Sequence, residues 1–296
     1  MGTKNTERSG INMNKKCTKA NNTKLLFDKI VKGIENIVSS GEYENFLKFC
    51  NTFHHYSFNN IILIFSQMKE ATKVAGFKQW QKLGRKIKKG EKGIQIIYPI
   101  KIGRNITSKD ISDKELEKDK DCIEFVTYRY TYVYDISQTE GSPIPLENNT
   151  IESNNLIIFF IFLKSFSPFP IYEQELFGSL KGYWNPSKKE IVLKNSLSTD
   201  AKVSVLLHEL THALYDNFNY KEKRNLSEVF VESVAFIVAD YFGLDTYKSS
   251  LNYIASWSNA DIKSILDIGD KIQKTANDFI TKLEKAYTTS TLKITG

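Results

Sequence analysis

Cysteine and histidine are scarce in this chain of 296 residues, which contains three cysteines and four histidines. The cysteines, at positions 17, 50 and 122, are odd in number and far apart, so they form neither a disulfide framework nor a C-x-x-C metal site. This number and spacing of cysteines favours a protein that works in a reducing compartment. Two of the histidines, His54 and His55, are adjacent and therefore point to different sides of a helix or strand, which makes them a poor pair of metal ligands.

A long apolar segment is also missing. The apolar run at residues 156–163 is eight residues long, which is too short to cross a bilayer. The first 22 residues are polar and basic and contain no apolar core of the signal-peptide type. We therefore expect a cytoplasmic protein with no membrane partner, and a disordered basic tail over residues 1–22.

Charge is distributed unevenly between the two halves of the chain. Residues 1–150 hold 25 Lys and Arg against 17 Asp and Glu, a net charge of +8, whereas residues 151–296 hold 16 against 17, a net charge of −1. This asymmetry favours a polyanion as the partner of the first half and a different role for the second.

The first half combines predicted helices with a basic loop and two strands. Helical periodicity predicts helices over residues 23–40, 42–53 and 57–65. Residues 84–93 contain three glycines and five cations and predict a mobile, strongly positive loop. Strands are predicted at residues 94–100 and 122–134, and the second places four alternating tyrosines on one sheet face: Tyr128, Tyr130, Tyr132 and Tyr134. Aromatic rings beside a basic loop suit single-stranded nucleic acid, because bases stack on the rings and phosphates bind the cations.

The second half contains the motif His208-Glu209-Leu210-Thr211-His212. Histidines four residues apart lie on one face of a helix, where they can hold one metal ion. H-E-x-x-H is the pattern of zinc metallopeptidases, in which the glutamate is the general base. Apolar neighbours predict a buried helix that starts near residues 199–201 and ends near residue 215.

A zinc site of this kind requires a third protein ligand. Glu228 and Glu232 lie four apart on a second, largely apolar helix predicted over residues 227–239. Glu232 has apolar neighbours and follows His208 by 24 residues, the spacing of thermolysin-like His-His-Glu sites. We predict Glu232 as the third Zn²⁺ ligand, with His208 and His212, and Glu209 as the catalytic base; Glu228 is the alternative ligand. Three tyrosines are candidates for stabilising the oxyanion, and the choice between them stays open: Tyr215, Tyr220 and Tyr241.

Several stretches resemble ArdC-type antirestriction proteins. Residues 56–100 and 132–141 are similar to the N-terminal domain of that family, and residues 232–236 match the E-S-V-A-aromatic signature of its C-terminal domain. The resemblance implies binding of single-stranded DNA from a mobile element. By family position it implies DNA contacts from six residues: Trp80, Arg85, Lys86, Lys88, Lys89 and Lys92. It also implies a zincin-like metallopeptidase domain, in which the strand at residues 191–193 pairs with the substrate backbone.

Together these features predict an α+β protein, with N-terminal helices and a small antiparallel sheet followed by a zincin-like domain. The expected units are the tail (1–22), a single-stranded DNA-binding domain (23–145), a linker and unassigned segment (146–180) and a metallopeptidase domain (181–288). The predicted function is a DNA-associated zinc metalloendopeptidase with a protein or peptide substrate. Two alternatives stay open: a non-catalytic, DNA-binding antirestriction protein with a structural zinc site, and an ImmA/IrrE-like regulatory protease that cleaves a repressor.

Overall fold

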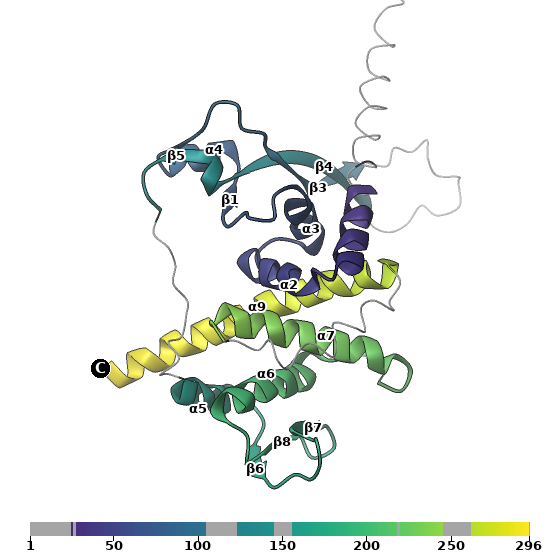
Figure 1. The fold of residues 1–296 in the computed structure, drawn as a ribbon, viewed down its shortest axis with the longest axis vertical. Coiled ribbons are helices and arrows are strands. Elements are labelled where there is room, and N and C mark those ends of the chain that lie inside the picture. Colours follow the sequence, from purple (N-terminus) through teal and green to yellow (C-terminus); the bar gives the residue numbers. More distant parts are fainter. Residues whose placement is uncertain are drawn as a thin grey trace, which may run out of the picture.

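The computed structural model describes residue 25 and residues 28–104, 123–144, 156–217, 220–244 and 262–295. The fold is α+β, as predicted, and combines long helices with small sheets (Figure 1). The expected tail at residues 1–22 lies outside the described residues. Within the described ranges, no helix is both long enough and apolar enough to cross a membrane.

The N-terminal helices form where hydrophobic periodicity predicted them. Residues 28–40 are helical, and α2 (Tyr43–Thr52) and α3 (Phe58–Gln67) follow. The hydroxyl of Ser57 accepts a hydrogen bond from the main-chain N–H of Asn60 at 3.4 Å, which caps the start of α3. The apolar faces of α2 and α3 are buried against the rest of the core.

The main sheet of the first half is a long antiparallel hairpin, β3 (Ile94–Arg104) and β4 (Ile123–Asp135), to which β1 (Val74–Ala75) adds on the side of β4. The outer edge of β3 is covered by two amide side chains of α3. Asn60 exchanges two hydrogen bonds with the main chain of Ile97, at 2.8 and 2.9 Å, and Gln67 does the same with Gln95, at 3.0 Å each. These amides satisfy main-chain groups of an edge strand, and they also fix α3 against the sheet.

A short helix and two short strands complete the first half. They are α4 (Phe77–Lys82), β2 (Arg85–Ile87) and β5 (Thr139–Gly141), and the 3-10 turn η1 (Ile136–Gln138) leads into β5. β2 and β5 pair antiparallel.

The segment expected to be a linker or unassigned, residues 146–180, contains the helix α5 (Leu156–Phe166) and the strand β6 (Ile171–Gln174). The helix α5 packs on α6, and β6 pairs parallel with β8 (Glu190–Lys194), which also pairs antiparallel with β7 (Gly182–Asn185). The sheet order is β6-β8-β7. Much of the segment expected to be a linker or unassigned is therefore part of this unit. Its apolar composition is explained by aromatic side chains of α5 that are buried in the core.

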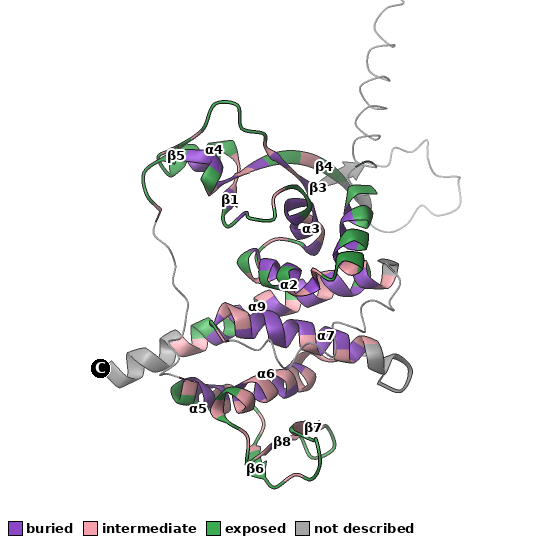
Figure 2. Ribbon diagram, in the orientation of Figure 1, coloured by how far each residue is buried: buried purple, intermediate pink, exposed green. Residues whose placement is uncertain are grey.

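Three long helices form the centre of the molecule: α6 (Thr199–Tyr215), α7 (Tyr220–Tyr241) and α9 (Ile262–Thr295). The helix α7 packs against α6, α9 and α2. Figure 2 shows that the buried residues follow these helices where they meet. The predicted H-E-x-x-H helix is confirmed as α6.

The two halves share one hydrophobic core and are joined by one buried and one partly buried hydrogen bond. The hydroxyls of Tyr43 on α2 and Ser233 on α7 lie 3.0 Å apart, and the amide of Asn51 donates to Asp240 at 2.7 Å. On α9, Gly269 faces the ring of Phe58 so closely that an added β-carbon would lie 2.1 Å from it. The division near residue 145 is thus a division of the sequence, whereas the packing is continuous.

Candidate metal centre and nucleic-acid interface

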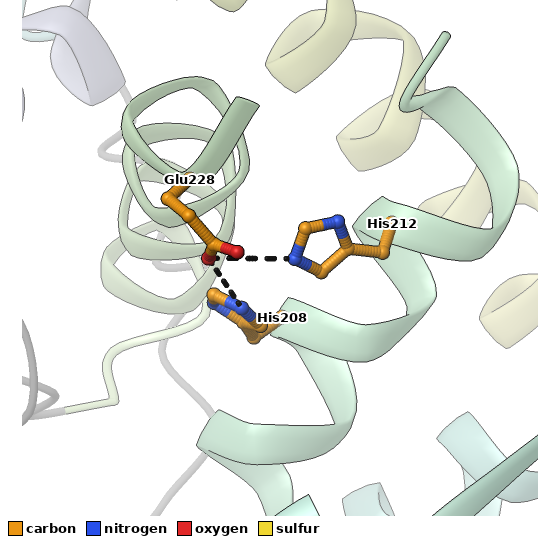
Figure 3. A group of neighbouring side chains, drawn as sticks. All are labelled: His208, His212 and Glu228. Atoms are coloured by element: carbon orange, nitrogen blue, oxygen red, sulfur yellow. Dashed lines mark ion pairs between the residues drawn. The ribbon is translucent and has the colours of Figure 1, made fainter. Parts of the chain in front are cut away.

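The donor atoms of the candidate metal centre come from α6 and α7. The Nε2 atoms of His208 and His212 lie 3.7 and 3.6 Å from the same carboxylate oxygen, Oε2 of Glu228 (Figure 3). Donors about 2.1 Å from a tetrahedral ion are separated by roughly 3.4 Å. The observed separations are close to that value, so two imidazoles and one carboxylate fit a divalent cation between them.

Each imidazole is held from behind by a second carboxylate. Nδ1 of His208 lies 2.9 Å from Oε2 of Glu232, and Nδ1 of His212 lies 2.9 Å from Oδ2 of Asp216. Ser227 donates a hydrogen bond of 2.5 Å to the same oxygen of Asp216. A carboxylate on Nδ1 favours the tautomer with its proton there, which leaves the Nε2 lone pair for a metal.

The structure brings Glu228 close to both Nε2 atoms, whereas Glu232, the predicted ligand, contacts Nδ1 of His208. Successive turns of α7 separate these glutamates by about 6 Å along the helix axis, since the rise is 1.5 Å per residue. The carboxylate of Glu228 therefore lies near the Nε2 atoms of both histidines, and that of Glu232, one turn further along α7, lies near Nδ1 of His208. Glu232 was predicted from its apolar neighbours and its spacing from His208, and its side chain is slightly better buried, at 14% exposure against 20% for Glu228. Burial did not discriminate between a ligand and the partner of a ligand.

Glu209 is a buried residue beside these donor atoms. It is 7% exposed, and its carboxylate accepts a hydrogen bond from the main-chain N–H of Trp184 on β7. Burial raises the pKa of Glu209, and the nearby His208 and His212 oppose that shift. A buried carboxylate with a raised pKa beside a metal-donor set is suited to accept and release a proton.

Two of the three tyrosines proposed to stabilise an oxyanion point away from the metal donors. Tyr215 packs on Phe279 of α9, with ring centroids 5.3 Å apart, and Tyr241 donates a hydrogen bond of 2.6 Å to Glu284 of α9. The side chain of Tyr220 lies outside the described residues. Neither Tyr215 nor Tyr241 is therefore a candidate for that role.

Trp80 is a core residue and cannot stack on a nucleic-acid base. It is fully buried, and its indole N–H donates to the main-chain oxygen of Tyr134 at 2.8 Å. Trp80 is the buried residue of α4, and the other residues of this helix are exposed. Trp80 was predicted as a DNA contact from its family position, and its burial does not favour that role.

Arg85 and Lys88 hold the loops of the first half together. The Arg85 guanidinium donates to the main-chain oxygens of Ser142 at 2.6 Å and of Thr139 at 3.0 Å, and the Lys88 ammonium donates to that of Ser137 at 2.7 Å. Arg85 is thus engaged with protein oxygens. The other predicted contacts are exposed on the surface: Lys86, Lys89 and Lys92.

The basic loop is anchored, although it was predicted to be mobile. The amide of Gln138 donates to the carboxylate of Glu91 and to the main-chain oxygen of Lys92, each at 2.9 Å. The main-chain N–H of Lys88 donates to the oxygen of Gln138 at 3.0 Å. The buried Gln138 therefore ties both sides of the loop to η1, and the exposed lysines project from a defined backbone.

The tyrosines of β4 form a stripe that starts where this loop ends. Tyr128, Tyr130 and Tyr132 face the alternate residues of β3 in the register, so they share one side of the hairpin. Tyr128 and Tyr132 are 41% and 45% exposed. A β-carbon at Gly93 would lie 2.9 Å from that of Tyr132, so the loop and the stripe are in direct contact.

Fold and site together define an α+β protein with a histidine–carboxylate donor set between two buried helices, joined to a basic and aromatic hairpin. Residues 20–134 match the family model of the N-terminal domain of the anti-restriction factor ArdC. The first half of the chain therefore contains an ArdC-type N-terminal domain, as the resemblance noted in its sequence implied.

Two solved structures and one curated relative extend the comparison. The metal-free crystal structure of antirestriction protein ArdC from plasmid R388 has a TM-score of 0.54 at 19% identity, and covers 79% of this chain and 86% of its own. The Mn(II)-bound structure gives 0.51 at 20% identity, with coverages of 78% and 84%. A Bacillus anthracis protein described as uncharacterized is 26% identical over 308 residues, which are 89% of this chain and 51% of that protein. The chain thus spans about half the length of that relative, and the structural likeness establishes the fold.

Proposed function

We propose that this chain is a cytoplasmic, DNA-associated metallopeptidase of the ArdC-like antirestriction type. It binds the single-stranded DNA of a mobile element through its first half and hydrolyses peptide bonds at the donor set of the second. The observation that carries the peptidase proposal is the convergence of two Nε2 atoms on Glu228, with Glu209 beside them. A site that only stabilised the fold would have no need of the buried carboxylate of Glu209.

The proposed metal is Zn²⁺, held by His208, His212 and Glu228, because two imidazoles and one carboxylate form a common catalytic zinc set. When bound, the cation supplies Lewis acidity that polarises a carbonyl group and acidifies a water molecule. Glu209 takes the proton from the attacking water and passes it to the leaving amine. Glu232 and Asp216 keep the two imidazoles oriented throughout.

The peptide substrate is proposed to pair with β7. The family resemblance implied that role for residues 191–193, but these belong to β8, whose two edges are already paired with β6 and β7. The outer edge of β7 is unpaired within the described sheet, and the N–H of Trp184 on this strand binds Glu209. An extended peptide that adds to this edge would therefore pass directly beside the proposed base.

Removal of the metal provides the test of the peptidase proposal. The zinc-loaded chain is expected to hydrolyse fluorescently labelled, unfolded casein, and a chelator is expected to abolish hydrolysis until Zn²⁺ is restored. Binding of a labelled single-stranded oligonucleotide is expected to survive chelation. DNA binding without hydrolysis would favour the non-catalytic antirestriction protein, and hydrolysis without DNA binding would favour the regulatory protease.

The proposed DNA surface consists of exposed lysines of the anchored loop and of the tyrosine stripe on β4. Replacing Lys89 and Lys92 by glutamine is expected to reduce the dependence of binding on salt by about 0.7 in log–log slope for each phosphate that the variant no longer neutralises. Replacing Tyr132 by alanine is expected to weaken binding by about 1–3 kcal/mol if a base stacks there. Fluorescence anisotropy at several salt concentrations measures both effects. Lys274→Gln, an exposed change on α9, is the control, and equal slopes in all variants would contradict the proposed surface.

A further inference from the structure

The loop between β6 and β7 exposes two large apolar side chains. Phe177 is 88% exposed, the highest value among the exposed large apolar residues of the described chain, and Leu180 is 46% exposed. Single exposed apolar residues are common on protein surfaces. This pair differs in that both residues lie on one loop beside a proposed binding edge.

This loop is fixed in place. The ammonium of Lys194 donates to the main-chain oxygen of Gly178 at 3.0 Å, and the main-chain N–H of the same residue donates to Lys181 at 2.8 Å. At the start of the loop, the N–H of Asn195 donates to the oxygen of Gln174 at 2.9 Å. The loop is thus tied to the end of β8, so Phe177 is held in solvent by the backbone around it.

The position of the loop relative to the metal donors follows from two contacts of β7. A β-carbon at Gly182 would lie 2.6 Å from Cγ1 of Val205, and Trp184 binds Glu209 further along the same helix. The strand therefore runs along α6 towards the donors and begins at the loop. An extended chain advances about 3.3 Å per residue, so Leu180, which is four residues before Trp184 and two before the start of β7, lies at most roughly 13 Å from Trp184.

We propose that Phe177 and Leu180 form an apolar subsite for the peptide substrate. A peptide that pairs antiparallel with the free edge of β7 runs from the metal donors towards this loop. The subsite then receives a residue about four positions beyond the cleaved bond on its C-terminal side, by the spacing of 3.3 Å per residue. The substrate class is an extended peptide segment with a large apolar side chain at that position. This inference rests on the proposed peptidase function.

Peptide affinity tests the subsite separately from hydrolysis. The experiment uses the zinc-loaded chain with Glu209→Gln to prevent turnover, and two fluorescein-labelled peptides of equal length, one rich in leucine and phenylalanine and one with serine in their place. Phe177→Ser combined with Leu180→Ser is expected to weaken binding of the apolar peptide about tenfold and leave binding of the serine peptide unchanged, because burying one large apolar side chain contributes about that factor. Ile161→Ser is the matched control, since Ile161 is 60% exposed on α5, a helix that packs on α6 and α9.

Each outcome of this experiment either supports or overturns the proposed subsite. Discrimination between the peptides that disappears in the loop variant, but persists in Ile161→Ser, supports the subsite. Equal binding of both peptides by the parent, or absence of binding, overturns it. Hydrolysis is then measured with Glu209 intact. If the loop variant cleaves casein with the same pattern as the parent, the chain is a peptidase without this subsite. If the parent discriminates between the peptides but does not hydrolyse casein, the subsite stands and the proposed peptidase function fails.

Discussion

Replacing Glu228 by glutamine is expected to lower the affinity for Zn²⁺ by far more than replacing Glu232. The neutral amide removes the carboxylate oxygen that lies within 3.7 Å of both Nε2 atoms. Glu232→Gln removes only the partner of Nδ1 on His208, and loss of such an orienting partner costs roughly ten- to hundredfold in metal affinity. Competition with a chromophoric chelator measures both dissociation constants.

This comparison decides between the ligand predicted from the sequence and the one that the geometry favours. Glu140→Gln, an exposed change on β5, is expected to bind Zn²⁺ as the unmodified chain does. A larger loss in Glu232→Gln than in Glu228→Gln would reinstate Glu232 as the ligand. A similar loss in both would mean that the two glutamates share the ion.

Replacing Glu209 by glutamine is expected to slow hydrolysis of casein by about 10²–10⁴-fold, the usual contribution of a general base. Glutamine keeps the size of the side chain but cannot take a proton from water. Because Glu209 is outside the set of three converging donors, zinc content and binding of single-stranded DNA are expected to stay unchanged. The three measurements are the initial rate on labelled casein, metal analysis of the purified variant and oligonucleotide anisotropy.

The combination of results is more informative than the rate alone. Undiminished cleavage in Glu209→Gln would sink the proposed mechanism. If the variant is slow and has also lost its zinc, the rate falls because the metal is missing. Glu209 would then contribute to metal binding and not to proton transfer. Asp216→Asn provides a useful contrast, because we expect it to weaken metal affinity through His212 while the base is still in place.

Features that depend on neighbouring residues were predictable from the chain. The spacing of apolar residues in α2, α3 and α6 gives each helix one face to bury, and the alternation of residues in β3 and β4 is typical of strands. The approximate ranges of these elements therefore followed from local patterns. The spacing of His208 and His212 places both rings on one side of α6 in any helical setting. The similarity to ArdC was also visible in continuous stretches of sequence.

Features that depend on the meeting of distant segments were decided by the tertiary structure. Glu228 and Glu232 occupy equivalent faces of one helix, and only the height at which α7 crosses α6 brings the first of them to the Nε2 atoms. Trp80 is covered because β4 returns to accept its indole N–H, fifty-four residues further along the chain. The central place of β8 depends on β6, which pairs with it from a segment without a clear pattern. In each case the composition and spacing were compatible with two arrangements, and packing between remote elements selected one.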